Sequence, residues 1–352
     1  MAAPKPLAIL TPESVRRERL ANGLTVLVRR DVTAPVVSIV TWVKAGYFDE
    51  PDDRVGIAHV LEHMYFKGTP TRGVGEIARA TKLAGGYLNA GTIYDHTHYY
   101  TVLPASGLRT GLEVQADAYA NSVIDADELA RELEVIIEET KRKADSAVPL
   151  ALETMFELLH DRHRIRRWRM GREAPLRGFT REHLLEFYRQ YYRPSNTVLA
   201  IVGDIDPDEA MAEARKRYGH LADAPVPRDR GPLETDAPGF RVREWAGDIA
   251  QTELVFGWRT PGITHADAPL LDMLGTLLST GRASRLVRAT RDRRLVSSIN
   301  AYNYTPTEIG VFVVHATATE GNALEAARTI ADQLRRVRRG EIAPDEVARA
   351  RQ

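Results

Sequence analysis

The strongest constraint on the fold is an internal repeat. Three segments recur in the same order at a near-constant offset of 211 to 218 residues: Val37–Gly46 with Thr252–Gly262, Tyr87–Ala90 with Ser298–Ala301, and Asp127–Arg131 with Asp345–Arg349. Each match alone is short, but their common order and spacing predict a duplicated domain. A chain of 352 residues is also long enough for two domains, each with its own core.

The repeat also predicts the domain boundaries. The first copy continues past Arg131 to about Tyr218, and residues 222–239 contain four prolines and are expected to be a linker. We therefore expect a first domain over 1–221 and a second over 240–352. The second copy stops soon after its equivalent of Arg131. By the repeat logic it lacks roughly 80–90 residues and is expected to be C-terminally incomplete.

Composition excludes several classes of protein and of site. The chain has 48 basic and 48 acidic residues, so it lacks the basic excess typical of nucleic-acid binding. It contains no cysteine, which excludes disulfides, a thiolate nucleophile and cysteine-ligated zinc. Any metal must therefore be held by His, Asp or Glu.

Local patterns predict alternating strands and helices. An Asn-Gly turn within Arg19–Val28 indicates a hairpin, and Val36–Val43 is a strongly apolar strand. Thr180 is expected to cap a helix over 180–190, with Glu182 near the capping-box position. The other predicted strands are 87–89, 98–103 and 197–203, and the other predicted helices are 55–66, 75–83, 108–122, 127–143 and 207–218.

The five residues from His59 to His63 read His-Val-Leu-Glu-His. Histidines at i and i+4 point to one face of a helix, where they can bind one ion, and Glu62 lies beside that face, placed to take a proton from a metal-bound water. This inverted arrangement is a zinc peptidase signature, with a chance expectation of about 0.02 in a chain of this composition. The alternative is a surface helix with two solvated histidines.

A catalytic zinc site needs a third protein ligand. Glu132 and Glu139 are seven residues apart on one predicted helix, so they share a face. Glu139 is the candidate ligand, and Glu132 is a second carboxylate placed to orient a histidine. The alternative is that both are ordinary residues of a solvated helix.

The sequence resembles the pitrilysin/insulinase family of zinc metallopeptidases, in particular its short bacterial and mitochondrial-processing-peptidase-like branch. The resemblance covers nearly all of residues 17–352, and the interval of 76 residues from His63 to Glu139 is the family's usual spacing. The matching motifs are Gly56–Met64 with Phe66–Thr69, Gly85–Ala90 with Thr92, Asp95, Thr97 and Tyr99, Val135–Glu139, Phe187–Asn196, and Val198–Asp206.

The resemblance implies an α+β fold of two homologous domains, each a mostly antiparallel sheet with helices packed on it. It implies one Zn²⁺ per chain, held by His59, His63 and Glu139, with Glu62 as general base in peptide-bond hydrolysis. Asn89 and Ala90 match the edge strand on which the family binds the substrate backbone, a mode that gives affinity with little sequence preference. Without the resemblance, Asn89 would be interpreted as a turn residue.

The second copy departs from the family pattern. The family supplies an Arg and a Tyr near the zinc from this domain; here Arg291 is available, but Ser297 stands at the Tyr position. No histidine pair occurs at the repeat of the zinc motif, so this copy is expected to be metal-free. We therefore expect a homodimer, or a heterodimer with a related subunit that lacks the zinc motif.

Two other functions remain open at this point. Some relatives are structural subunits that have lost the zinc motif, and an incomplete second copy could leave the chain an inactive fragment. The compartment also stays open: the sequence as given fits the cytoplasm, and removal of a signal peptide would place the protein in the periplasm. His96 and His98 share a strand face, but without a visible third ligand they are expected to be polar-face residues.

Overall fold

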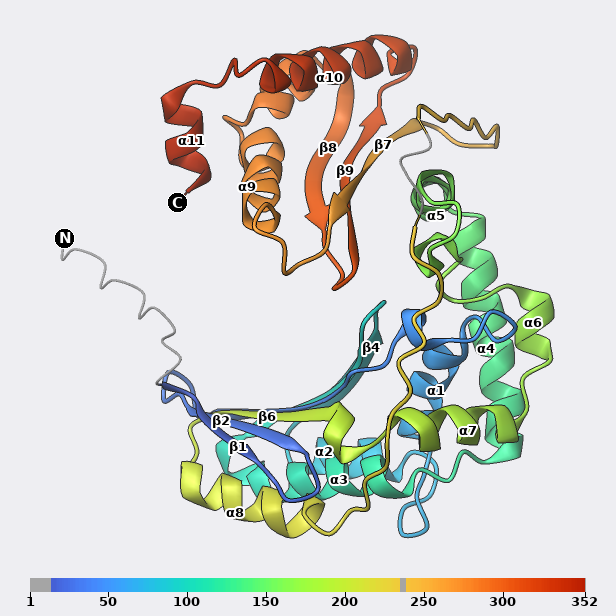
Figure 1. The fold of residues 1–352 in the computed structure, drawn as a ribbon, viewed down its shortest axis with the longest axis vertical. Helices are drawn as coiled ribbons and strands as arrows, with labels where there is room; N and C mark the ends of the chain where they lie inside the picture. Colours follow the sequence, from blue (N-terminus) through green and yellow to red (C-terminus); the bar gives the residue numbers. More distant parts are fainter. Residues whose placement is uncertain (1–13, 235–238, 352) are drawn as a thin grey trace, which may run out of the picture. The chain divides into compact units, whose positions relative to one another are not determined.

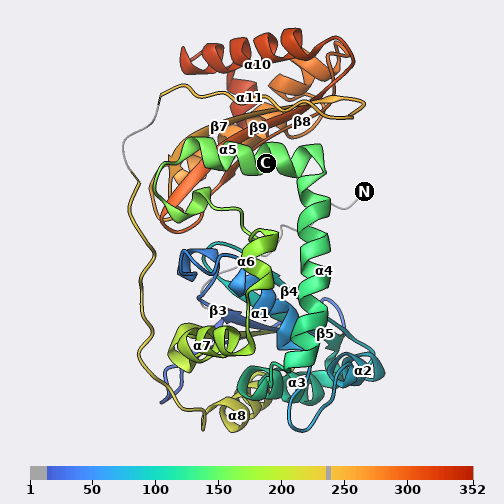
Figure 2. The same cartoon turned by 90° about the vertical axis from the view of Figure 1, so that its right-hand side faces the viewer.

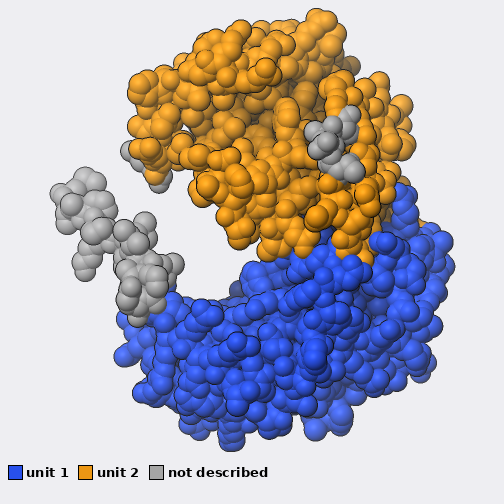
Figure 3. Space-filling view, viewed as in Figure 1, with its two compact units in different colours: residues 1–138, 169–230 blue, residues 139–168, 231–352 orange. Residues whose placement is uncertain are grey.

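The computed structural model describes residues 14–234 and 239–351. The chain forms two compact units, residues 1–138 with 169–230 and residues 139–168 with 231–352 (Figure 3). Residues 139–168, from the middle of the first sequence copy, thus group with the second unit. Between Tyr218 and Thr252 the described residues contain no helix or strand. None of the described helices is both long and apolar enough to cross a membrane.

The first unit is built on a six-stranded sheet with the order β1-β2-β6-β3-β5-β4. The predicted hairpin is confirmed, since β1 and β2 pair antiparallel around a turn in which Gly23 takes a φ of 88°. Among the described strands, β2 and β6 alone pair in parallel. The strands are β1 (Arg16–Arg19), β2 (Thr25–Arg30), β3 (Val36–Val43), β4 (Tyr87–Thr92), β5 (Thr97–Pro104) and β6 (Thr197–Gly203).

Helices of this unit cover one face of the sheet, as Figure 1 shows for α1, α2, α3, α7 and α8. Alternate residues of β3 and β5 are buried against those helices, which is the period-2 pattern of a sheet covered on one side. The helices are α1 (Ile57–Tyr65), α2 (Glu76–Leu83), α3 (Leu108–Asn121), α6 (Glu173–Arg177), α7 (Arg181–Tyr191) and α8 (Pro207–Tyr218), with short turns η2 (Tyr47–Asp49), η3 (Ala105–Gly107) and η5 (Pro194–Asn196). Helix α4 (Ala126–Ala144) begins in this unit, and its residues from Glu139 onward group with the second unit.

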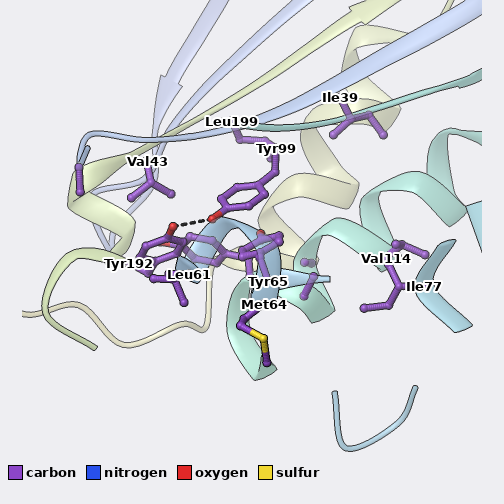
Figure 4. Packing of buried hydrophobic residues seen from close by; sticks show 14 of the residues in the cluster. Ile39, Val43, Leu61, Met64, Tyr65, Ile77, Tyr99, Val114, Tyr192 and Leu199 are labelled. Atoms are coloured by element: carbon purple, nitrogen blue, oxygen red, sulfur yellow. Dashed lines mark hydrogen bonds between the residues drawn. The ribbon is translucent and has the colours of Figure 1, made fainter. Parts of the chain in front are cut away.

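A cluster of buried tyrosines lies where α1 meets the sheet (Figure 4). The ring of Tyr65 stacks on that of Tyr99 with centroids 3.5 Å apart, and the hydroxyls of Tyr99 and Tyr192 lie 2.6 Å apart. Met64 and Leu61, on the same side of α1, are also fully buried. This packing fixes α1 against β5 and determines which of its side chains face away from the core.

The second unit repeats the strand order of the first. Strands β7 (Thr252–Pro261), β9 (Ile309–Ala318) and β8 (Val296–Tyr304) form an antiparallel sheet in the order β7-β9-β8, which corresponds to β3-β5-β4. This correspondence confirms the predicted duplication. The helical segments of this unit also include η4 (Arg164–Arg166), α9 (Ala268–Ser279), η6 (Val287–Arg291), α10 (Ala323–Arg338) and α11 (Pro344–Ala350).

Helix α5 (Ala147–Leu159) packs on this second sheet, as Figure 2 also shows. The contact is close at Gly257 of β7, where an added Cβ would lie 2.3 Å from the sulfur of Met155. Glycine at this position therefore permits the helix to approach the strand. This contact explains why a segment that follows α4 in the chain groups with the second unit.

The helix cap predicted at Thr180 is present, but its partner is not the predicted one. The Thr180 hydroxyl accepts a hydrogen bond from the backbone N–H of His183, and the His183 ring accepts one from the backbone N–H of Thr180, both at 3.3 Å. The reciprocal partner is thus His183, and the expectation for Glu182 was wrong. Position N3, three residues after the cap, is the one from which a side chain reaches back to the cap.

Candidate metal centre

Helix α1 carries the His-Val-Leu-Glu-His motif, and a buried carboxylate holds its first turn. Gly56 precedes the helix with a φ of 101°, a conformation that favours glycine. The two carboxylate oxygens of Glu50 accept hydrogen bonds from the backbone N–H groups of Gly56 at 3.0 Å and Ala58 at 2.9 Å. A negative charge at a helix N-terminus satisfies otherwise unpaired donors and stabilises the helix.

The structure brings His59, His63 and Glu139 together. One ligand atom from each lies within 4.8 Å of the others, and the two imidazole centroids are 4.7 Å apart. In the part of the chain that the structure describes, this is the one cluster of three such side chains. Two imidazoles and one carboxylate are donors that zinc takes, and three protein ligands leave a coordination position open. The donor set therefore fits a catalytic zinc ion.

Glu132 lies beside this cluster and contacts one of its histidines. Its Oε2 atom is 3.1 Å from Nδ1 of His63, which leaves Nε2 of that ring to bind a metal. Its Oε1 atom accepts a hydrogen bond from the amine of Lys67. Burial would raise the pKa of Glu132, but the hydrogen bonds from Lys67 and His63 outweigh it and hold that pKa below its usual value. An ionised Glu132 is suited to orient the His63 ring.

Helix α4 supplies both acidic residues from one side. Figure 2 shows α4 as one continuous helix, which runs from Ala126 to Ala144. Glu132 and Glu139 are seven residues apart on it, so they lie two turns apart along one face. The amine of Lys143 lies 3.3 Å from Oε1 of Glu139. A metal at the cluster would share this carboxylate with Lys143.

Glu62 is connected to the edge of the sheet. Its Oε2 atom accepts a hydrogen bond from the hydroxyl of Thr92, the last residue of β4. Sequence reasoning included Thr92 in the family motif but gave it no role. Lys67, two residues beyond the end of α1, also belongs to the matching motif and was given no role, although it contacts Glu132 as His63 does.

The two residues predicted to bind the substrate backbone lie on β4, one of the two edge strands of the six-stranded sheet. The side-chain oxygen of Asn89 accepts a hydrogen bond from the backbone N–H of Ala90 at 2.8 Å. Arg291 lies in the second unit. It is the last residue of η6 and is exposed. Its role near the metal stays a prediction.

Comparison with known proteins identifies the family. Residues 25–165 match the model for insulinase (peptidase family M16), and residues 178–352 match that for the peptidase M16 inactive domain. An uncharacterized zinc protease of Mycobacterium tuberculosis is 31% identical over 348 residues, which cover 97% of this chain and 78% of that protein. The chain belongs to peptidase family M16. An uncharacterized zinc protease of Rickettsia felis is 29% identical over 314 residues, 87% of this M16 chain and 74% of that protein.

Solved structures agree with this assignment. A protease from Helicobacter pylori superimposes with a TM-score of 0.91 at 25% identity, covering 96% of this M16 chain and 82% of that chain. A peptidase M16 inactive domain from Pseudomonas fluorescens superimposes with a TM-score of 0.81 at 20% identity, over 96% of this chain and 82% of that one. The second comparison supports the fold alone.

Proposed function

We propose that the protein is a zinc-dependent endopeptidase that hydrolyses peptide bonds in peptides or unfolded segments. The observation that carries the proposal is the convergence of His59, His63 and Glu139, with Glu62 on the same helix as the two histidines. A structural subunit has no need to keep these four side chains together.

Each residue has a distinct task in this proposal. His59, His63 and Glu139 would hold the ion, and Glu132 would orient the His63 ring. Zinc in such a site acts as a Lewis acid and lowers the pKa of water toward 7. Glu62 takes a proton from the attacking water and delivers it to the leaving amine. The hydroxyl of Thr92 fixes the Glu62 carboxylate through the hydrogen bond to Oε2.

The substrate backbone would bind along β4. This strand forms one edge of its sheet, and an edge strand offers main-chain hydrogen bonds to an added extended peptide. Asn89 and Ala90 lie in the middle of β4, within three residues of Thr92. A peptide added there would run close to Glu62, which Thr92 contacts.

The second copy of the fold would help to hold the substrate through Arg291. Because Ser297 stands where the family has a tyrosine, we propose that a second subunit completes the site. That subunit is a second copy of this chain or a related chain without the zinc motif.

The test is cleavage of an unstructured quenched-fluorescent peptide by the purified full chain loaded with zinc. Glu62→Gln should lower kcat/KM by about 10²–10⁴-fold while zinc content stays the same, because only the general base is lost. Glu134→Gln is the matched control, since Glu134 lies on α4 with a 61% exposed side chain that pairs with Arg177.

Two results would contradict the proposal. Undiminished cleavage by Glu62→Gln would remove Glu62 from the reaction. Bound zinc with no cleavage, also after mixing with a related subunit, would favour a catalytically silent partner in a peptidase-like complex.

A further inference from the structure

The segment predicted as the linker is docked on the first unit by two arginines. The guanidinium of Arg228 donates hydrogen bonds to the backbone carbonyl of Lys44, at 3.1 Å, and to the side-chain oxygen of Asn196. Two residues later, Arg230 is the last residue that groups with the first unit. The linker therefore stays attached to this unit up to Arg230.

Arg230 bridges two carboxylates. Its Nη1 atom donates a hydrogen bond to Oδ1 of Asp95 at 3.1 Å, and its Nε atom lies 3.5 Å from Oδ1 of Asp49. The Asp49 side chain has no exposed surface, and 19% of the Arg230 side chain is exposed. An ion pair withdrawn from water in this way keeps its partners in place, because removing one leaves the other buried without a counter-charge.

The two aspartates belong to two loops that lie against each other. The backbone N–H of Tyr47, in η2, donates a hydrogen bond to the carbonyl of Ile93 at 3.0 Å. The next N–H along the chain, that of Phe48, donates to the carbonyl of Tyr94 at 2.9 Å. Residues 93–96 form the turn between β4 and β5, so the side chain of Arg230 ties this turn to η2 beside those backbone hydrogen bonds.

The same turn bears on the proposed general base. Thr92 ends β4 and directly precedes the turn, and its hydroxyl donates a hydrogen bond to Oε2 of Glu62. Asp95, which Arg230 holds, lies three residues after Thr92. A displacement of the turn would therefore move this hydroxyl and release the Glu62 carboxylate.

We propose that Arg230 is a positioning residue for peptide hydrolysis, which holds the Glu62 carboxylate in place through the β4–β5 turn and Thr92. The inference rests on the proposed function and adds to it a residue of the linker. Burial raises the pKa of Asp49, the Arg230 charge lowers it, and the Asp95 charge raises it again. The two carboxylates thus repel each other, and without the guanidinium this repulsion would push the turn away from η2.

The first readout is steady-state cleavage of the quenched-fluorescent peptide by the zinc-loaded full chain. Arg230→Gln should lower kcat about tenfold and change KM by less than about twofold, because a misplaced general base slows the chemical step. Zinc content should stay the same, since the metal-binding side chains are unchanged. Arg230→Lys should recover most of the loss, because it restores a positive charge between the two carboxylates.

Hydrogen exchange is the second readout and does not depend on activity. Backbone amides of residues 91–97 should exchange faster in Arg230→Gln than in the wild type, because the turn opens more easily. Arg228→Gln is the matched control for both readouts, since it removes an arginine of the same linker whose hydrogen bonds go to Lys44 and Asn196. It should cleave the peptide and exchange at the turn like the wild type.

The outcomes separate this inference from the proposed function. Wild-type kcat in Arg230→Gln, an equal loss of kcat in Arg228→Gln, or unchanged exchange at the turn would each overturn the role of Arg230. A wild-type chain that binds zinc but cleaves no peptide would overturn the proposed function and the positioning role with it. Faster exchange in Arg230→Gln would still support the part of the inference in which Arg230 holds the turn.

Discussion

At the scale of single residues, the candidate centre depends on carboxylates whose tasks differ with their surroundings. Glu139 contributes an oxygen to the three-residue cluster, and Glu132 contacts the Nδ1 atom of the His63 ring. Glu134, on the same helix, pairs with Arg177 at the surface. Their positions along α4 distinguish these three glutamates, although the residue type is identical.

Glu132→Gln should weaken zinc binding by about 10–100-fold, because the His63 ring loses its ionised partner. Competition against a chelator of known affinity measures the change, and circular dichroism checks that the chain is folded. Glu134→Gln should bind zinc like the wild type. Equal zinc affinities for both variants would show that Glu132 does not orient His63.

Two buried groups of the first unit should give opposing pH dependences. Burial raises the pKa of Asp49 to about 6, so the stability linked to this group is present below its unfolded pKa and lost as pH rises through 6. Burial, with the neighbouring His98 ring, lowers the pKa of His96 to about 4, so its contribution is present above pH 6.5 and lost as pH falls toward 4.

The His96 ring stacks on that of Trp42, and His96→Phe keeps a ring there but removes the titration. We compare the change in the free energy of unfolding between pH 7 and pH 5. This change should be more favourable in His96→Phe than in the wild type by about 1–2 kcal/mol, because the variant has no imidazole to protonate. Urea unfolding at the two pH values measures both differences. If the free energy of unfolding depends on pH in the same way in the variant and in the wild type, the pKa of His96 is not lowered by folding.

At the scale of secondary-structure elements, local patterns predicted most of the first unit. The alternating apolar residues of β3 and the helical spacing in α1 are encoded within each segment, so both appear where expected. The parallel pairing of β2 with β6 joins segments about 170 residues apart, and no local pattern specifies it. Glu50 at the start of α1 was missed for a similar reason, since its loop position resembles any solvated acid.

Glu50→Gln should lower the free energy of unfolding by about 1–3 kcal/mol, because an amide cannot accept both hydrogen bonds from the first turn of α1. Zinc affinity should fall as well, since α1 carries His59 and His63. Glu209→Gln is the control at an exposed helix N-terminus, on α8. A stable variant with unchanged zinc binding would show that Glu50 does not hold α1 in place.

At the scale of the whole molecule, the repeat predicted the strand order that the two units share. Strand order β7-β9-β8 reproduces β3-β5-β4, as the matched segments require. The grouping of α5 with the second unit was not predicted, because it depends on contact between Met155 and Gly257, far apart in the sequence. The metal cluster was predictable because the His-Val-Leu-Glu-His spacing is local and the helix of Glu139 is regular.

The central claim is that one zinc ion binds at His59, His63 and Glu139. The most direct measurement is anomalous diffraction at the zinc absorption edge from crystals of the zinc-loaded chain. We predict one peak per chain, at about 2.0–2.2 Å from one nitrogen of each histidine and from a Glu139 oxygen. A zinc-loaded crystal without a peak there, or with its only peak at other side chains, would contradict the account.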